Sequence, residues 1–245
     1  MFLGHFAVAF AVKRVAPEAK LGTAVVAAQL LDLIWPLLVM FGYEVVTIQP
    51  GITAADPLNF VSYPYSHSLV MAAVYAALFA LVYWRRTGSA RAAGWMGAAV
   101  LSHWVLDFLS HRPDLPLTPG GEMKVGLGLW NSLPATIVVE VGLLAVGLAL
   151  YLSVTRARDR RGVWGLWVFV AVLLASYAGA EFGPPPPNVA SVIAPALFGI
   201  AVLLTLAYWI DRHRDTIKGR DASAGTAGGT AGGTAGDTAG DTVQR

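Results

Sequence analysis

The sequence predicts an all-α protein, a polytopic membrane helical bundle with about seven transmembrane helices. Three observations lead to this prediction. Of the 245 residues, 56% are hydrophobic and only 13% are charged, whereas a soluble domain usually carries about 25% charged residues. The apolar residues form runs long enough to cross a bilayer. The basic residues gather in alternate loops between those runs, as they do in multi-pass membrane proteins.

Six apolar runs approach or exceed the roughly 20 residues that a transmembrane helix needs. They cover residues 21–42, 67–84, 92–109, 131–152, 163–182 and 189–210. A shorter run, residues 1–12, ends in Lys13 and Arg14. Because the positive charges of a signal peptide precede its apolar run, we interpret residues 1–12 as a retained helix. At about 18 Å, this seventh helix spans only with the help of its flanks or tucked against its neighbours.

The basic residues predict how the bundle is oriented. Fifteen of the 17 follow the first, third, fifth and seventh predicted helices. The remaining two, Arg112 and Lys124, lie in the loops on the opposite side. Since cytoplasmic loops are enriched in Lys and Arg, we expect a multi-pass protein of the plasma (inner) membrane. Its N-terminus is expected outside and its C-terminus in the cytoplasm.

The composition also indicates how the chain divides into segments and which classes of partner to expect. We expect residues 1–218 to form the transmembrane domain and residues 219–245, in which Thr-Ala-Gly recurs, to form a disordered low-complexity cytoplasmic tail. The chain has no cysteine, which excludes disulfides, thiolate ligands and a cysteine nucleophile. The basic residues sit in short loops, so nothing points to nucleic acid. Membrane lipids, and a lipid-linked substrate, are the expected partners.

Histidines and aspartates occur where a membrane tolerates them poorly. His5, Asp32, His67, His103 and Asp107 lie in or beside the apolar runs, and the predicted topology brings all five to the outer half or the midplane. Polar groups at membrane depth are costly, rare and usually functional. Histidine and carboxylate together are ligands for a divalent transition metal. We therefore predict that these five residues bind one metal ion, with zinc the expected metal.

Two further residues are candidates for moving a proton. His111 follows His103 and Asp107 at a spacing of i, i+4, i+8, which would place all three on one helix face. Because Pro113 disfavours helix at Arg112, His111 is expected at the rim of the site or behind its ligands. Glu140 is a second carboxylate inside an apolar run. We assign His111 and Glu140 as candidate catalytic residues.

Structural explanations compete with these assignments. His5 could be a solvated residue at the membrane interface. His67 could belong to a helix N-terminus that Ser66 caps. Glu140 could be a general base, a metal ligand or a hydrogen-bonded packing residue. Asp32 has the fewest alternatives, because the four residues around it are leucine and isoleucine.

Four short motifs resemble those of the YdjM-like family, which is described as inner-membrane-associated, metal-dependent hydrolases. The motifs occur in the family's order within residues 1–115: Gly4-His5, Leu31-Asp32 followed by Pro36, Ser66-His67-Ser68-Leu69, and Ser102-His103-x-x-x-Asp107. The resemblance implies a membrane-associated hydrolase that depends on a metal.

The chain departs from the family pattern at two places. The family motif H-R-G-x-T-H-S is replaced by Ser62-Tyr63-Pro64-Tyr65-Ser66-His67-Ser68, so one histidine and the arginine are missing. The second aspartate of the acidic P-D-x-D-like segment is also absent, since Ile34 follows Leu33. Three interpretations stay open: a mononuclear site, ligands supplied by His111 or Glu140, or an inactive relative.

The leading hypothesis is a membrane-embedded, metal-dependent hydrolase that acts at the outer half of the membrane on a lipid or lipid-linked ester or phosphoester. A proton- or ion-coupled transporter would use the same intramembrane His and Asp residues. A noncatalytic scaffold would use them for interhelical hydrogen bonds. If these residues share a metal centre, the side chains of His67, His103 and Asp107 must converge on one point.

Overall fold

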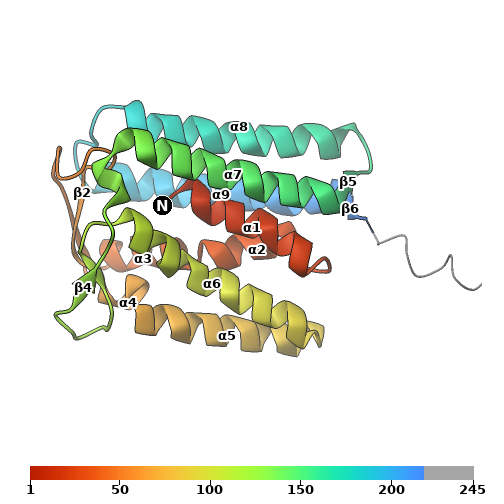
Figure 1. Ribbon diagram of the computed structural model, residues 1–245, viewed down its shortest axis with the longest axis horizontal. Helices are drawn as coiled ribbons and strands as arrows, with labels where there is room; N and C mark the ends of the chain where they lie inside the picture. The colour runs from red at the N-terminus through yellow and green to blue at the C-terminus, as the bar shows by residue number, and fades with distance from the viewer. Residues whose placement is uncertain (218–245) are drawn as a thin grey trace, which may run out of the picture.

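The computed structural model describes residues 1–217 and has the expected all-α membrane architecture. Five of its helices are long and apolar enough to cross a bilayer. They run along the long axis of the molecule, as Figure 1 shows, and they are α5 (Leu69–Thr87), α6 (Ala90–Ser110), α7 (Leu133–Val154), α8 (Arg160–Phe182) and α9 (Ala190–His213). The proposed tail, residues 219–245, lies outside the described residues.

The first part of the chain folds into shorter helices. These are α1 (Leu3–Val15), α2 (Leu21–Ala28), α3 (Leu30–Met40) and the single turn α4 (Pro64–His67). The apolar run at 21–42 is therefore not one straight helix, because α2 and α3 meet at Gln29 with a bend of 53°. Counting this pair as one span gives six. The expected count of about seven is not confirmed, since α1, with 13 residues, is only about 20 Å long.

Three pairs of antiparallel strands close the two ends of the bundle. The hairpin β1 (Val45–Ile48) and β2 (Leu58–Ser62) lies at one end, with the short pair β3 (Leu115–Pro116) and β4 (Lys124–Val125). The pair β5 (Thr155–Ala157) and β6 (Arg214–Thr216) lies at the opposite end, as Figure 1 shows. A 3-10 turn, η1 (Leu129–Asn131), leads into α7.

Four of the long helices begin at a side-chain cap. The capping oxygen accepts a hydrogen bond from the backbone N–H three residues later, which satisfies one of the helix's unpaired donors. The caps are Ser68 of α5, Ser89 of α6, Ser132 of α7 and Asp159 of α8. The suggestion that Ser66 caps the helix after His67 is therefore wrong, because Ser68 holds that position.

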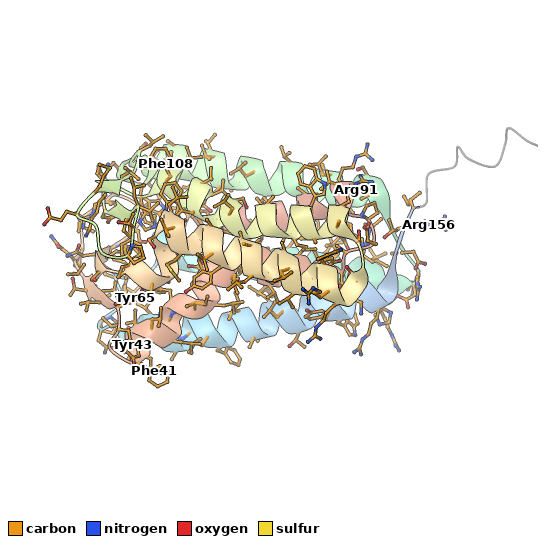
Figure 2. The ribbon with its side chains drawn as sticks, turned by 90° about the horizontal axis from the view of Figure 1, so that it is seen from below. Phe41, Tyr43, Tyr65, Arg91, Phe108 and Arg156 are labelled. Atoms are coloured by element: carbon orange, nitrogen blue, oxygen red, sulfur yellow. The ribbon has the colours of Figure 1, made fainter. Side chains whose placement is uncertain are left out.

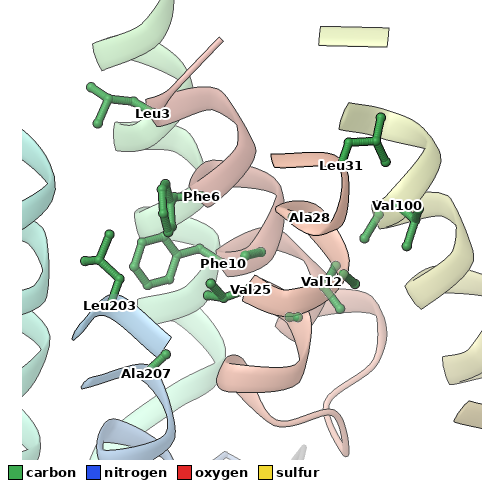
Figure 3. Close-up of a cluster of buried hydrophobic side chains, with 14 of the residues drawn as sticks. Leu3, Phe6, Phe10, Val12, Val25, Ala28, Leu31, Val100, Leu203 and Ala207 are labelled. Carbon is green, nitrogen blue, oxygen red and sulfur yellow. The ribbon is translucent and has the colours of Figure 1, made fainter. Parts of the chain in front are cut away.

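The core of the molecule forms around α1. Phe6 and Phe10 of α1 are 1% exposed, and both rings pack against Phe169 of α8. Figure 3 shows them in the buried cluster with Leu203 of α9. Between helices in lipid, close packing and small residues drive association, because lipid tails are as apolar as leucine. Gly147 of α7 is such a residue: a Cβ there would be 2.4 Å from the Ala7 carbonyl oxygen. The short helix α1 is therefore packed closely against α7.

Charge is distributed unequally between the two ends. Arg91 and Arg156 lie at one end of the bundle, whereas Phe41, Tyr43 and Tyr65 lie at the other, as Figure 2 shows. The ends of α1, α5 and α9 that carry consecutive basic residues share the Arg91 end in Figure 1. This arrangement agrees with the alternation of basic loops along the chain. The structure does not include a membrane, so the inside–outside assignment remains a prediction.

Candidate metal centre

Five side chains from four helices converge inside the half of the bundle near the β1–β2 hairpin. We call them the His/Asp cluster: His5 of α1, Asp32 of α3, His67 of α4, and His103 and Asp107 of α6. Within it, His5, His103 and Asp107 form one group whose ligand atoms lie within 4.8 Å of one another, and Asp32, His67 and His103 form another. The rings of His67 and His103 are 5.4 Å apart. The predicted convergence of His67, His103 and Asp107 is confirmed.

The ligand atoms of the cluster are spaced as the donors around one ion would be. Asp107 Oδ2 is 3.2 Å from His103 Nε2 and 3.6 Å from His67 Nε2. Asp32 Oδ1 is 3.5 Å from His67 Nε2 and 3.7 Å from His103 Nε2. His5 Nε2 is 3.2 Å from Asp107 Oδ1. Donors about 2.0–2.2 Å from a zinc ion lie roughly 3–4 Å from one another, so the spacing within each group suits one ion.

These close approaches leave ring nitrogens without hydrogen bonds. Neither ring nitrogen of His5, nor Nε2 of His103, has a hydrogen-bond partner in the described structure, although all three atoms are buried. A buried polar atom without a partner is costly and rare. The rings of His5 and His103 are also stacked, with centroids 3.6 Å apart. The free nitrogens are therefore available to ligate a cation.

The five side chains of the cluster differ in how exposed they are. The side chains of His5, His67, His103 and Asp107 are at most 5% exposed, whereas that of Asp32 is 38% exposed. Asp32 lies in the first turn of α3, directly after the bend at Gln29. Asp32 is therefore the member of the cluster whose side chain is most exposed.

The break between α2 and α3 fixes the hydrogen-bonding state of His103. In an unbroken helix the Ala28 carbonyl would accept the N–H of Asp32, four residues later. Here it accepts His103 Nδ1, at 2.8 Å. A carbonyl only accepts, so Nδ1 carries a proton, and Nε2, which faces the carboxylates, is the nitrogen that could ligate a metal. This is the usual second-shell arrangement for a metal-binding histidine.

His67 is oriented by a relay from a buried glutamate. The Ser66 hydroxyl donates to Glu44 Oε2 at 2.6 Å and lies 2.7 Å from His67 Nδ1. A hydroxyl has only one proton to donate. Ser66 must therefore accept from His67 Nδ1, which leaves Nε2 as the His67 nitrogen that faces the cluster. Glu44 itself is 1% exposed and accepts the backbone N–H groups of Tyr65 and Ser66, both at 2.8 Å.

The cluster as a whole has an excess of electron-pair donors. Two carboxylates face Nε2 of His67 and of His103, and the Met1 amino group, 2.6 Å from Asp107 Oδ1, supplies one positive charge beside them. Such a set is stable only when a cation or additional protons lie between the donors. Nitrogen and oxygen donors of this kind suit zinc and related divalent ions. The buried His and Asp residues thus could hold a metal ion.

His111 lies outside the cluster, in a separate group that we call the loop network: Asn59, Tyr63, His111, Arg112 and Asp114. Helix α6 ends at Ser110 and the backbone of His111 is extended, so the i, i+4, i+8 face does not reach it. Its Nδ1 is 3.1 Å from Asp114 Oδ1, which also accepts from the Tyr63 hydroxyl at 3.1 Å. His111 makes no hydrogen bond or ion pair with the described members of the cluster.

Every charge in the loop network has a partner. Arg112 donates through Nε to Asp114 Oδ2 at 2.9 Å and through an NH2 group to Asn59 at 2.5 Å. Burial, together with the neighbouring Asp114 carboxylate, raises the pKa of the Tyr63 phenol well above its usual value. Tyr63 therefore remains a donor. The network joins the β1–β2 hairpin to the loop after α6 and covers the site from that end.

Glu140 is also outside the cluster. It is 1% exposed, and its Oε2 accepts the backbone N–H groups of Phe2, Leu3 and Gly4 at the start of α1. Its hydrogen bonds in the described structure go to α1, and none goes to a side chain of the cluster. The assignment of Glu140 and His111 as catalytic residues is not tested by this geometry.

Sequence reasoning missed the groups that orient the two histidines. Glu44 lies in a loop and was not singled out, although a carboxylate directly after an apolar run was a signal. Ser66 was noticed only as a helix cap. No residue in the sequence pointed to the Ala28 carbonyl, because this backbone group becomes available only through the break at Gln29.

Fold and site together define a multi-pass membrane protein with a buried histidine–carboxylate centre that could hold a metal ion. The YdjM inner membrane protein family matches residues 1–182. The chain belongs to this family, and the match extends well beyond the motifs in residues 1–115. No curated protein and no solved structure gives a significant match.

Proposed function

We propose that the protein is a membrane-embedded, metal-dependent hydrolase whose metal centre is the His/Asp cluster. One observation carries the proposal: His67 and His103 turn their Nε2 atoms, 3.2–3.7 Å away, toward two carboxylates. Four such groups so close together need a cation or additional protons between them, and we propose that a metal ion is that cation. Membership of an inner membrane family supports the membrane setting.

We assign a different role to each of the five residues of the proposed site. His67 and His103 would hold the ion, with their rings oriented by Ser66 and Ala28. His5 would be the third imidazole ligand, and Asp107 the carboxylate that all three histidines approach. A divalent ion such as zinc, when bound, lowers the pKa of a coordinated water to about 7 and polarises an ester or phosphoester. Asp32, the exposed member, is placed to accept a proton from a water molecule that enters beside it.

The expected substrate is a lipid or lipid-linked ester or phosphoester. The cluster lies between helices of a membrane bundle, so a substrate that already resides in the membrane reaches it without leaving the lipid. In the proposed orientation the site opens toward the outer half of the membrane.

Metal content is the first test of the proposal. Detergent-purified wild-type protein is expected to contain about one equivalent of zinc or a similar metal, as a single site requires. The Asp32→Asn/His103→Ala double variant is expected to contain none. Release of water-soluble product from lipid ester and phosphoester mixtures should then depend on the metal. Equal metal content in the two proteins would sink the proposal.

A proton relay is the competing function that this test separates. The same contacts would arise if His67 and His103 were protonated and donated to Asp32 and Asp107. A metal-free wild-type protein that drives proton-linked uptake in vesicles would establish that function instead. A metal-free protein with neither activity would leave the scaffold as the explanation.

We also propose that the N-terminus lies outside and the C-terminus in the cytoplasm. The chain has no cysteine, so single cysteines report the orientation directly. A Gly120→Cys variant should react with an impermeant maleimide on intact cells, because an added side chain meets nothing within 4 Å there. A Thr226→Cys variant should be protected. The reverse labelling pattern would invert the topology.

A further inference from the structure

We infer that Glu140 is a positioning residue, which anchors the start of α1 and thereby places His5 in the metal centre. The inference rests on the proposed function for the role of His5, and on the structure for the anchor itself. Glu140 Oε2 accepts the N–H groups of Phe2 at 2.9 Å, of Leu3 at 2.5 Å and of Gly4 at 3.4 Å. The third of these residues directly precedes His5.

The start of α1 needs such an acceptor. The first amides of any helix have no partner within the helix, and unpaired backbone groups are especially costly in a membrane. The residue before α1, Phe2, offers no side-chain cap. A carboxylate at this position satisfies three donors and also matches the positive end of the helix dipole.

Two contacts then fix α1 against α7. Glu140 holds its first turn, and two turns further along α7 the missing side chain of Gly147 lets the Ala7 backbone approach closely. His5 lies between these two points. With both ring nitrogens unpaired, His5 has no hydrogen bond of its own to orient it. Its position is therefore set by the backbone of α1.

The structure uses the same arrangement a second time. Asp211 of α9 accepts the N–H groups of Leu21 at 2.8 Å and of Gly22 at 3.0 Å, at the start of α2. Helix α2 ends at Ala28, whose carbonyl orients His103. Helices α1 and α2 are thus each anchored at the first turn by a carboxylate from a long helix.

A glutamine substitution separates an anchor from a general base. Glutamine keeps an oxygen that accepts N–H groups but cannot accept a proton at neutral pH. An anchor therefore tolerates Glu140→Gln and not Glu140→Ala, whereas a general base tolerates neither. Glu181→Ala is the matched control, because it removes a carboxylate whose Oε2 has no hydrogen-bond partner in the described structure.

The experiment measures cobalt(II) affinity by visible absorption, and amide hydrogen exchange, on the full-length chain in detergent. Glu140→Ala should weaken cobalt binding by about 10- to 100-fold, as loss of a second-shell partner does, and should speed exchange at the first amides of α1. Glu140→Gln and Glu181→Ala should resemble the wild type in both measurements.

The outcomes distinguish this inference from the proposed function. A wild-type protein that binds no cobalt would count against the metal centre, yet exchange at α1 would still report on the anchor. If Glu140→Ala leaves α1 exchange unchanged, the anchor is wrong. If Glu140→Gln binds cobalt normally but loses all hydrolysis, Glu140 carries a proton and the inference is overturned. If Glu140→Ala does not fold, the Gln variant alone decides between the two roles.

Discussion

The His/Asp cluster and the loop network contain the same kinds of buried residue but differ in how their polar atoms are paired. In the loop network, Asp114 accepts from Tyr63, His111 and Arg112, so its charge is fully matched. In the cluster, the histidine–carboxylate approaches of 3.2–3.7 Å leave buried ring nitrogens without hydrogen bonds. A buried histidine beside an aspartate is therefore not enough to indicate a site. The unused donor atoms are what distinguish one.

The difference also assigns distinct tasks to the two regions. A fully satisfied network gives rigidity and holds loops together, and the loop network joins two loops at one end of the bundle. An unsatisfied set of donors carries a free-energy cost until a ligand binds. The following predictions test whether this division is correct, beginning with the largest effect.

The sharpest contrast is between alanine variants of two histidines in the same part of the chain. His103→Ala should abolish metal binding, because His103 belongs to both groups of potential ligands. His111→Ala should keep the full metal content and lose stability instead, by about 1–3 kcal/mol for the hydrogen bond lost from Asp114. Elemental analysis and thermal unfolding of both variants measure this. If both variants lost the same amount of metal, the cluster and the loop network would not differ in metal binding.

Chelation should destabilise the wild type alone. A ligand present at about 100 times its Kd stabilises the folded state by about 2.7 kcal/mol, so removing the metal should lower the Tm of the wild type by several degrees. The Asp32→Asn/His103→Ala variant should unfold at the same temperature with and without chelator. A chelator effect of similar size in both proteins would place the metal elsewhere.

Tyr63→Phe should affect the loop network and spare the cluster. It removes a donor to Asp114, at a cost of about 1–3 kcal/mol, with unchanged metal content. The pH dependence has a defined sign. Because the pKa of the Tyr63 phenol is raised on folding, its contribution to stability is complete below the unfolded pKa of about 10 and is lost as the pH rises toward the folded value. Unfolding at several alkaline pH values, in wild type and variant, checks this component.

The two serines beside His67 should behave differently when each is changed to alanine. Ser66→Ala breaks the relay from Glu44 and should weaken metal binding by about tenfold, at the lower end of second-shell effects. Ser68→Ala removes only the cap of α5 and should cost about 1 kcal/mol of stability with unchanged affinity. Ser66→Thr should restore binding. Metal titration gives the affinities, and a weaker affinity for Ser68→Ala than for Ser66→Ala would contradict the relay.

Much of the fold and the cluster could be predicted from the sequence, because each rests on a strong physical signal. Apolar runs located the five long helices to within a few residues, since the bilayer sets their length. The cost of polar groups in a membrane singled out the cluster residues. Both signals depend on residue type alone.

The features that escaped prediction depend on the backbone. Nothing in the apolar run at 21–42 marks Gln29 as the point of the break, and Pro36, the stronger signal, lies inside α3. Without the break, neither the freed Ala28 carbonyl nor the exposure of Asp32 could be foreseen. The hydrogen bonds of Glu140 to α1 were equally hidden, since backbone amides leave no pattern in the sequence. The expected number of spans was not confirmed for the same reason, because helix length and bending decide it.

The bend at Gln29 makes the geometry of a membrane span and the state of one imidazole ring depend on each other. In the bent structure the Ala28 carbonyl accepts from His103 Nδ1 in place of the helix hydrogen bond to residue 32, and Asp32 on the other side of the bend lies 3.7 Å from the second nitrogen of the same ring. Straightening α2 and α3 would draw the Ala28 carbonyl into the helix hydrogen bond with residue 32 and so move the group that orients His103. We therefore expect bilayer thickness and lateral pressure, which favour straight or bent spans, to change the metal affinity that we propose for the centre.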